Sequence, residues 1–213
     1  MPLQQYRNYR KMSGGKAAAL LIAAALLAVL VSLGGWLIIR AISRGEERQE
    51  RYDELIEQAG RRNGVDPDLI RAVIWRESNF DRRKIGGKGE IGLMQIMPSA
   101  GAAEWARVNK RSVPGKAQLS DPALNIEIGS WILGRAMKRW SGYKDRIALA
   151  LCEYNAGFSR ANAWKPQNPS ASVFERIKID STKKYASDII RQYAEYRREK
   201  AKRKEKESGI RGK

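Results

Sequence analysis

The sequence contains no histidine and a single cysteine, Cys152, and these absences exclude several common kinds of active site. Without histidine there is no Ser-His or Cys-His nucleophile pair, and the usual zinc sites are removed as well. One cysteine cannot form a disulfide within the chain. Cys152 lies in the apolar run 147–152, which favours a buried structural thiol. Acid/base chemistry must therefore come from carboxylates, lysine, tyrosine or that thiol, and we expect neither a metal nor a cofactor.

Acidic residues are few compared with basic ones. The chain has 23 Asp and Glu against 41 Lys and Arg, which gives a formal net charge of +18. Nucleic acid, a membrane surface or an anionic cell-wall polymer would each attract such a chain. A nucleic-acid partner is disfavoured because the sequence shows neither a helix-turn-helix nor an aromatic-basic stacking pattern. Charge alone does not choose between the other two partners.

One long run, residues 17–39, carries no charge. It is long enough to cross a bilayer as a helix, for which about 20 apolar residues suffice. Trp36 stands near its end, where interfacial aromatic residues occur. We expect a transmembrane anchor at 17–39 preceded by a basic cytoplasmic segment, 1–16. A cleaved signal peptide is the alternative, although its apolar part is typically only ~7–15 residues long.

The remainder of the chain reads as a linker at 40–50, one domain at 51–195 and a basic tail at 196–213, which we expect to be disordered, with a frayed helix as the alternative. Asp66 and Pro67 predict a helix start, with an aspartate N-cap and proline at the first helical position. No stretch shows convincing strand alternation, so we expect an all-α fold. Its expected helices cover residues 46–63 and 67–78, the segment after Pro98, and residues 122–140, 145–155 and 182–198, with loops at 79–92 and 162–172.

Glu77 occupies an unusual place in the helix that begins at Pro67. Ile70, Val73 and Ile74 form an apolar stripe, and Glu77 is the next position on the same face. Burial raises the pKa of a carboxyl, which suits a general acid that acts near neutral pH. On periodicity alone, a glutamate that turns outward at the helix end or pairs with an arginine remains the alternative.

Two further segments place polar groups among apolar ones. Gln95 lies within GLMQIMP, residues 92–98, after a glycine-rich loop, and its amide could bind sugar hydroxyl or acetamido groups. Tyr154 and Asn155 stand just before Gly157 at the end of an apolar helix, where they could bind a sugar or a catalytic carboxylate. Backbone capping is the alternative for both segments. Each signal is weak when it is taken singly.

In this order the segments resemble the Slt-type lytic transglycosylases, which have the goose-type lysozyme fold. The resemblance runs from about Tyr52 to Tyr193. Four motifs carry it: the Glu-Ser pair in AVIWRESNF at 72–80, GLMQIMP at 92–98, YNAG at 154–157, and a tyrosine in STKKYASDII, which is Tyr185. Their order and separations make the resemblance specific.

The resemblance implies a role for each matching residue. Glu77 would be the single catalytic acid/base. The substrate-binding residues would be Ser78 beside the sugar, Met94 and Gln95 along the groove, Tyr154 and Asn155 on the far wall, and Tyr185 orienting Glu77 or the acetamido group. Glu90 and Glu153 depart from the pattern, because the family usually has small or neutral residues there. They leave open a second carboxylate near the site.

The resemblance implies cleavage of peptidoglycan between N-acetylmuramic acid and N-acetylglucosamine, with a 1,6-anhydromuramic product. The domain would then lie on the periplasmic face of the bacterial inner membrane, held by one span. An envelope-spanning machinery would be a further partner. A hydrolytic lysozyme of the same fold and a non-catalytic scaffold protein are the alternatives. The intact Glu77, Gln95 and Tyr154-Asn155 argue against the scaffold.

Overall fold

The computed structural model describes residues 21–23, 25–37, 40, 47 and 49–211, and the chain divides into two compact units, Met1–Glu50 and Arg51–Lys213. In the first unit, residues 21–23 and 25–37 are helical. The predicted cytoplasmic segment, residues 17–20, 24 and 38–39 of the predicted anchor, and most of the linker lie outside the described residues. Where the chain is described, none of its helices has the length and apolar character needed to cross a membrane.

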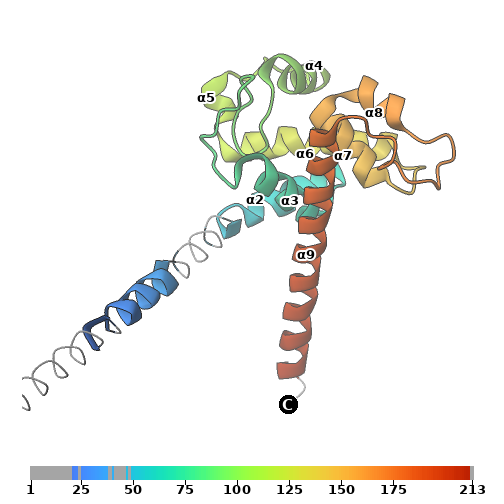
Figure 1. Cartoon of the computed structure of the whole chain (residues 1–213). Coiled ribbons are helices and arrows are strands. Elements are labelled where there is room, and N and C mark those ends of the chain that lie inside the picture. The colour runs from blue at the N-terminus through green and yellow to red at the C-terminus, as the bar shows by residue number, and fades with distance from the viewer. Residues whose placement is uncertain (1–20, 24, 38–39, 41–46, 48, 212–213) are drawn as a thin grey trace, which may run out of the picture. The chain divides into compact units, whose positions relative to one another are not determined.

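The second unit is helical, as the sequence predicts (Figure 1). The described residues form no extended strand, only isolated bridges that join Ile91 to Ile85 and to Ile96. A π-helical turn, η1 (Pro98–Ala102), precedes α4. The helices are α2 (Asp53–Asn63), α3 (Pro67–Ser78), α4 (Ala103–Val108), α5 (Lys116–Leu119), α6 (Pro122–Arg139), α7 (Arg146–Ala156), α8 (Phe158–Trp164) and α9 (Asp180–Arg211).

Helix α3 has the boundaries that its sequence predicts. The Asp66 side chain accepts a hydrogen bond from the backbone N–H of Asp68, and Pro67 occupies the first turn, where its missing N–H costs no helical hydrogen bond. Asn79 ends the helix in the left-handed conformation, with φ 51°. These two caps fix the position of Glu77 in the last turn of α3.

The core forms where α3 packs against α2 and α9 and where α6 packs against α2 and α7. The predicted stripe of Ile70, Val73 and Ile74 is fully buried. Cys152 is buried in the same core, as predicted, and burial raises the pKa of its thiol to about 12. Because the stripe continues to Glu77, the core face of α3 leads directly to the candidate site.

The structure departs from the predicted boundaries at several places. Residues 51–52 form a turn within the helix predicted at 46–63, so α2 begins at Asp53, and the short helix α5 was not predicted. Helix α8 occupies part of the segment that we expected to be a loop, and α9 continues to Arg211 where we expected a disordered tail. Figure 1 shows the outer part of α9 extending beyond the other helices of its unit. This segment is rich in Ala, Lys, Arg and Glu, which favour helices. Lys200 also lies 3.7 Å from a carboxylate oxygen of Glu57 and 3.9 Å from one of Asp68, which ties the extension to α2 and α3.

Candidate active site

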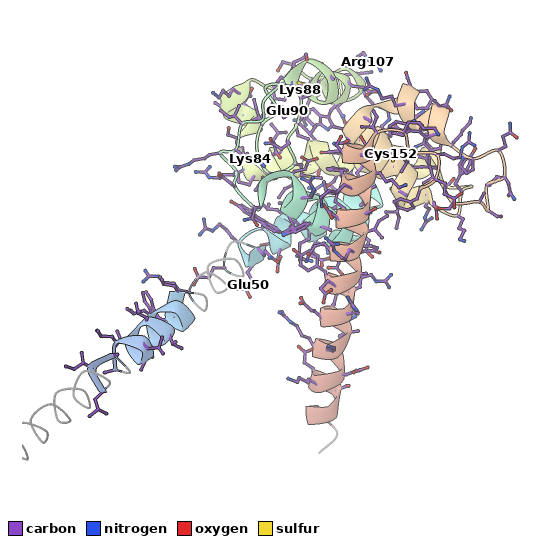
Figure 2. The ribbon with its side chains drawn as sticks, viewed as in Figure 1. Glu50, Lys84, Lys88, Glu90, Arg107 and Cys152 are labelled. Carbon is purple, nitrogen blue, oxygen red and sulfur yellow. The ribbon has the colours of Figure 1, made fainter. Side chains whose placement is uncertain are left out.

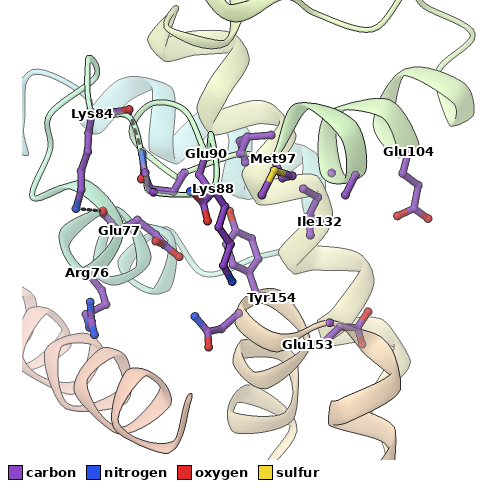
Figure 3. A pocket seen from close by; sticks show the side chains of 18 of the residues that line it. Arg76, Glu77, Lys84, Lys88, Glu90, Met97, Glu104, Ile132, Glu153 and Tyr154 are labelled. Atoms are coloured by element: carbon purple, nitrogen blue, oxygen red, sulfur yellow. Dashed lines mark hydrogen bonds between the residues drawn. The ribbon is translucent and has the colours of Figure 1, made fainter. Parts of the chain in front are cut away.

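An open cleft of about 710 Å³ lies where α3, the glycine-rich loop, η1 and α7 meet (Figure 3). Its walls include both charged and apolar side chains. Figure 2 shows Lys84, Lys88 and Glu90 grouped on the loop between α3 and η1. The lining residues that bear on the chemistry are Arg76, Glu77, Lys84, Lys88, Glu90, Gln95, Glu153, Tyr154 and Asn155.

Glu77 presents its carboxylate to the cleft from the last turn of α3 (Figure 3). Its Oε1 accepts a hydrogen bond of 2.6 Å from the Tyr185 hydroxyl on α9. Its backbone carbonyl accepts a second bond, of 2.5 Å, from Lys84 Nζ. The residue that continues the apolar stripe is therefore held at its side chain and at its backbone, by two separate segments.

Burial raises the pKa of Glu77 above its ordinary value, as its place on the stripe predicts. The Tyr185 hydrogen bond and the positive charges of Arg76 and Lys84 oppose this shift, and the negative charge of Glu90 adds to it. Desolvation is the largest of these effects, so the net shift is upward. A carboxyl with this balance can carry a proton closer to neutral pH than an exposed glutamate can.

Gln95 lies on the cleft wall in a constrained loop. Its φ is 47°, and its Nε2 donates to the carbonyls of Lys84 and Gly92, at 3.1 and 2.9 Å. A Cβ on Gly86 would lie 2.8 Å from Gln95 Oε1 and 2.3 Å from Glu90 Oε2, so any side chain there would displace the ends of these two side chains. The Gln95 amide thus stabilises the loop that carries Lys84 and Lys88, and its oxygen lies near the cleft.

Met94 differs from its predicted place because it is fully buried and lies outside the cleft lining. Its backbone N–H donates to Asn125 Oδ1 at 2.8 Å, and its carbonyl accepts from the Tyr154 hydroxyl at 2.8 Å. A Cβ on Gly129 would lie 2.3 Å from the Met94 sulfur, so α6 makes room for this side chain. Met94 therefore locks GLMQ into the core, and the adjoining Gln95 reaches the cleft.

The other predicted residues divide between the cleft and its support. Tyr154 and Asn155 line the cleft, and Asn155 Oδ1 accepts a bond of 2.8 Å from the Thr182 hydroxyl. Ser78 is buried and donates to the Ile74 carbonyl of its own helix at 3.2 Å, so it turns away from the cleft. Tyr185 is also buried, and it reaches the site through its bond to Glu77.

The two departures from the family pattern, Glu90 and Glu153, both line the cleft. Glu153 accepts a hydrogen bond of 2.8 Å from the indole N–H of Trp140 and lies 3.3 Å from Arg139 Nε, so it has structural partners. Glu90 accepts from the backbone N–H of Lys88 at 2.9 Å, and its charge acts on Glu77. Of the two, Glu90 is the second carboxylate that affects the site.

Sequence reasoning did not single out Arg76, Lys84, Lys88 or Asn125. Asn125 is a buried amide that bonds the Met94 N–H and the carbonyls of Ile91 and Leu119, and it holds the loop under the cleft. A polar residue on the apolar face of the helix after Pro122 could have indicated this role. Among the described residues, no group of three or more His, Cys, Asp or Glu side chains is arranged to hold a metal ion.

Two curated relatives, both longer proteins, match parts of this chain. A membrane-bound lytic murein transglycosylase C from Mannheimia succiniciproducens is 31% identical over 152 residues, which cover 67% of this chain and 38% of that protein. The protein of the same name from Haemophilus influenzae is 39% identical over 92 residues, 41% of this chain and 26% of that protein. The chain therefore spans well under half the length of these relatives.

Solved structures show a similar fold. The match to an inactive mutant of the lytic transglycosylase Slt from Pseudomonas aeruginosa has a TM-score of 0.59 and 27% identity, and covers 66% of this chain and 23% of that one. The 70 kDa soluble lytic transglycosylase from Escherichia coli matches with a TM-score of 0.60 and 25% identity, over 68% of this chain and 24% of that one. The profile of the transglycosylase SLT domain matches residues 54–177, which include Glu77, the GLMQIMP segment and YNAG. The chain belongs to the transglycosylase SLT domain family and has its all-α, lysozyme-like fold.

Proposed function

We propose that the protein is a peptidoglycan lytic transglycosylase that cleaves the β-1,4 bond between N-acetylmuramic acid and N-acetylglucosamine. One observation carries the proposal: the Glu77 carboxyl lines an open cleft, has a raised pKa, and accepts a 2.6 Å hydrogen bond from Tyr185. The names of the relatives and the family of the domain support the same activity.

In the first step Glu77 acts as a general acid. Its proton passes to the glycosidic oxygen as the bond from that oxygen to C1 of the muramic residue breaks. Desolvation raises the pKa of Glu77 and so favours the protonated form that this step needs. The 2-acetamido oxygen of the muramic residue stabilises the positive charge that develops at C1.

In the second step the same carboxyl acts as a base. Glu77, now ionised, takes the proton from the C6 hydroxyl of the muramic residue while that oxygen bonds to C1. The product is a 1,6-anhydro sugar, water takes no part, and Glu77 regains its proton. The Tyr185 hydroxyl stabilises the ionised form between the two steps, because it donates to the carboxylate.

The cleft walls supply groups that suit a glycan. We assign Gln95 and Asn155 to contacts with sugar hydroxyl and acetamido groups, because both line the cleft and each has a second partner that fixes it. Tyr154 forms the far wall, where its hydroxyl is bound to the Met94 carbonyl. The remaining predicted residues support the site from outside the cleft. Ser78 bonds within α3, Met94 anchors the loop in the core, and Tyr185 holds Glu77.

A hydrolytic lysozyme is the second candidate, and Glu90 is the observation that favours it. Glu90 lines the same cleft as Glu77 and could activate a water molecule there. The test is mass spectrometry of the fragments that the full chain releases from purified sacculi. Anhydromuramic ends are expected. Reducing muramic ends would identify a lysozyme, and no release would leave only a binding or scaffold role.

We also propose that residues 17–39 anchor the protein in the bacterial inner membrane, with residues 51–195 on the periplasmic face. The uncharged run and the membrane-bound names of the relatives support this arrangement. Retention in the membrane fraction through high salt and carbonate tests it, and release by salt alone would refute it. An envelope-spanning machinery is an additional partner under this proposal.

A further inference from the structure

The residue before the candidate acid, Arg76, contacts groups on two sides. Its Nε lies 3.6 Å from Asp188 Oδ2 on α9. Its guanidinium carbon lies 5.5 Å from the centre of the Tyr185 ring, which is cation–π distance. Figure 3 shows Arg76 reaching from α3 toward α9, with Glu77 beside it. Arg76 therefore touches the tyrosine that donates to Glu77.

Asp188 is well placed to fix this arginine. It stands three residues after Tyr185 on α9, and its side chain is only 10% exposed. Lys184 lies 2.8 Å and Arg191 3.0 Å from its oxygens, and both pairs are within α9. The hydrogen bond from Lys184 is the largest cause that lowers the pKa of Asp188, and the nearby cations add to it. Asp188 thus stays ionised and holds Arg76 through a lasting charge.

The contact has a direct electrostatic consequence. Burial is the largest effect on the Tyr185 hydroxyl and raises its pKa, and the positive charge of Arg76 opposes that rise. A hydroxyl whose pKa is lowered is a stronger hydrogen-bond donor to the Glu77 carboxylate. The groups that face Glu77 are Tyr185 from α9, Tyr154 from α7, Lys84 and Glu90 from the loop, and Arg76 from α3. Arg76 is the cation among them that is itself anchored by a buried carboxylate.

We propose that Asp188 and Arg76 are positioning residues. Asp188 holds Arg76, and Arg76 acts on Glu77 by its own charge and through Tyr185, so that the pair stabilises the ionised acid between the two proton transfers. The inference rests on the proposed function for its catalytic meaning. The electrostatic coupling of Asp188 and Arg76 to Glu77 can be measured separately, because it does not depend on which product the enzyme forms.

A matched control stands on the same helix. Arg71 lies over the Tyr196 ring at 5.7 Å and pairs with Asp68 and Asp53, but neither Arg71 nor Tyr196 lines the cleft. Arg71→Gln therefore breaks a contact of the same type between α3 and α9 without touching Tyr185.

The experiment is a ¹³C NMR titration of the Glu77 carboxyl, assigned with Glu77→Gln, in the full chain and in Arg76→Gln, Arg76→Lys, Asp188→Asn and Arg71→Gln. Arg76→Gln is expected to raise the pKa of Glu77 by about one unit, and Asp188→Asn to raise it less. Arg76→Lys should restore most of the wild-type value because it keeps the charge. Arg71→Gln should lower stability and leave the titration unchanged.

The double variant Arg76→Gln/Asp188→Asn decides whether Asp188 acts through Arg76. Its pKa should equal that of Arg76→Gln alone, since the effect of Asp188 is then already lost. The value of kcat on sacculi should fall roughly tenfold in Arg76→Gln, with a smaller change in KM, because Arg76 stabilises the ionised Glu77 that stands between the two proton transfers. The inference would be overturned if the two substitutions shifted the pKa of Glu77 additively, or if Arg76→Gln left that pKa unchanged. A wild type that titrates as expected but cleaves nothing would instead count against the proposed function.

Discussion

Helices α3 and α9 meet through two arginine–tyrosine contacts of nearly the same geometry, and only one of them borders the cleft. Arg71 lies 5.7 Å from the Tyr196 ring centre and Arg76 lies 5.5 Å from that of Tyr185. The Arg71 side chain is 13% exposed and paired with two aspartates, whereas that of Arg76 is 37% exposed. The buried contact fastens the helices. The cleft contact does this too, but its tyrosine also donates to Glu77.

The comparison teaches that the type of contact does not decide its role. Both contacts join the same two helices, so both should contribute to stability. The two contacts differ in what the tyrosine hydroxyl binds: at the cleft, Tyr185 donates to Glu77, a carboxyl of raised pKa. Substitutions in the two contacts should therefore differ most in their effect on catalytic activity and least in their effect on stability.

The largest expected effect comes from replacing Glu77, the carboxyl that receives the Tyr185 hydrogen bond, because this removes the transferable proton. Glu77→Gln keeps the shape and hydrogen-bonding capacity of the side chain but cannot transfer a proton. Activity should fall by at least 10²–10⁴-fold, since general acid–base assistance is typically of that size and one residue serves both steps. The variant should stay folded and still bind glycan strands, as judged by circular dichroism and sacculus pull-down.

Glu90→Gln and Glu153→Gln are the matched carboxylates for that experiment. Each should lose much less activity than Glu77→Gln if neither transfers the proton. Near-normal cleavage by Glu77→Gln, together with an inactive Glu90→Gln or Glu153→Gln, would move the acid to another residue.

The two tyrosines give the next largest contrast. Tyr185→Phe removes the 2.6 Å bond to Glu77, and kcat should fall roughly tenfold to hundredfold, since a hydrogen bond to a charged group contributes about 1.5–3 kcal/mol. Tyr196→Phe, at the other end of the interface, should change kcat by less than about twofold. Steady-state release of soluble fragments measures both. Equal losses at the two ends would show that the interface acts only by holding the fold.

The pH profile should respond to Glu90 by a smaller amount. Glu77 must be protonated to act as an acid, so kcat/KM should fall as pH rises through its raised pKa. The negative charge of Glu90 raises that pKa, so Glu90→Gln should lower it and move the basic limb of the profile to lower pH. Glu153→Gln serves as the control. A limb that moves upward, or equally in both variants, would contradict this account of the electrostatics.

The smallest effect is expected at the outer part of α9. Deleting residues 199–213 should weaken sacculus binding at low salt, because the segment is basic and peptidoglycan is negative, while exposed charges are screened within ~8–10 Å at physiological salt. The fold and kcat should be retained. Binding that stays unchanged across a salt series would count against a role in surface affinity. Because Lys200 pairs with Glu57 and Asp68, a deletion after Lys200 is the control that keeps this tie.

The fold class and the position of Glu77 could be predicted because local chemistry fixes them. Asp66, Pro67 and the apolar stripe set the start and the register of α3, and the register places Glu77 on the buried face. Tyr185 was found through its motif, although its contact partner lies 108 residues away in the chain. Such pairings depend on how the helices pack against one another, which the apolar periodicity of a single helix does not predict.

The supporting residues were harder to predict for the same reason. Met94 was expected in the groove, but the left-handed turn at Gln95 and the hydrogen bonds of Asn125 direct it into the core. Arg76 looked like one of many surface arginines until α9 brought Asp188 within 3.6 Å of it. In the helical continuation of α9, Lys200 lies near carboxylates of α2 and α3, a proximity that the local sequence does not reveal because those residues are distant in the chain.

The central claim is that one carboxyl, Glu77, performs both proton transfers and that no water enters the product. The most direct test is digestion of purified sacculi by the full chain in H₂¹⁸O, followed by mass spectrometry of the muramic ends. The account predicts anhydromuramic ends without ¹⁸O from the wild type, and no new ends from Glu77→Gln. Reducing ends that carry ¹⁸O, or anhydromuramic ends released by Glu77→Gln, would contradict it.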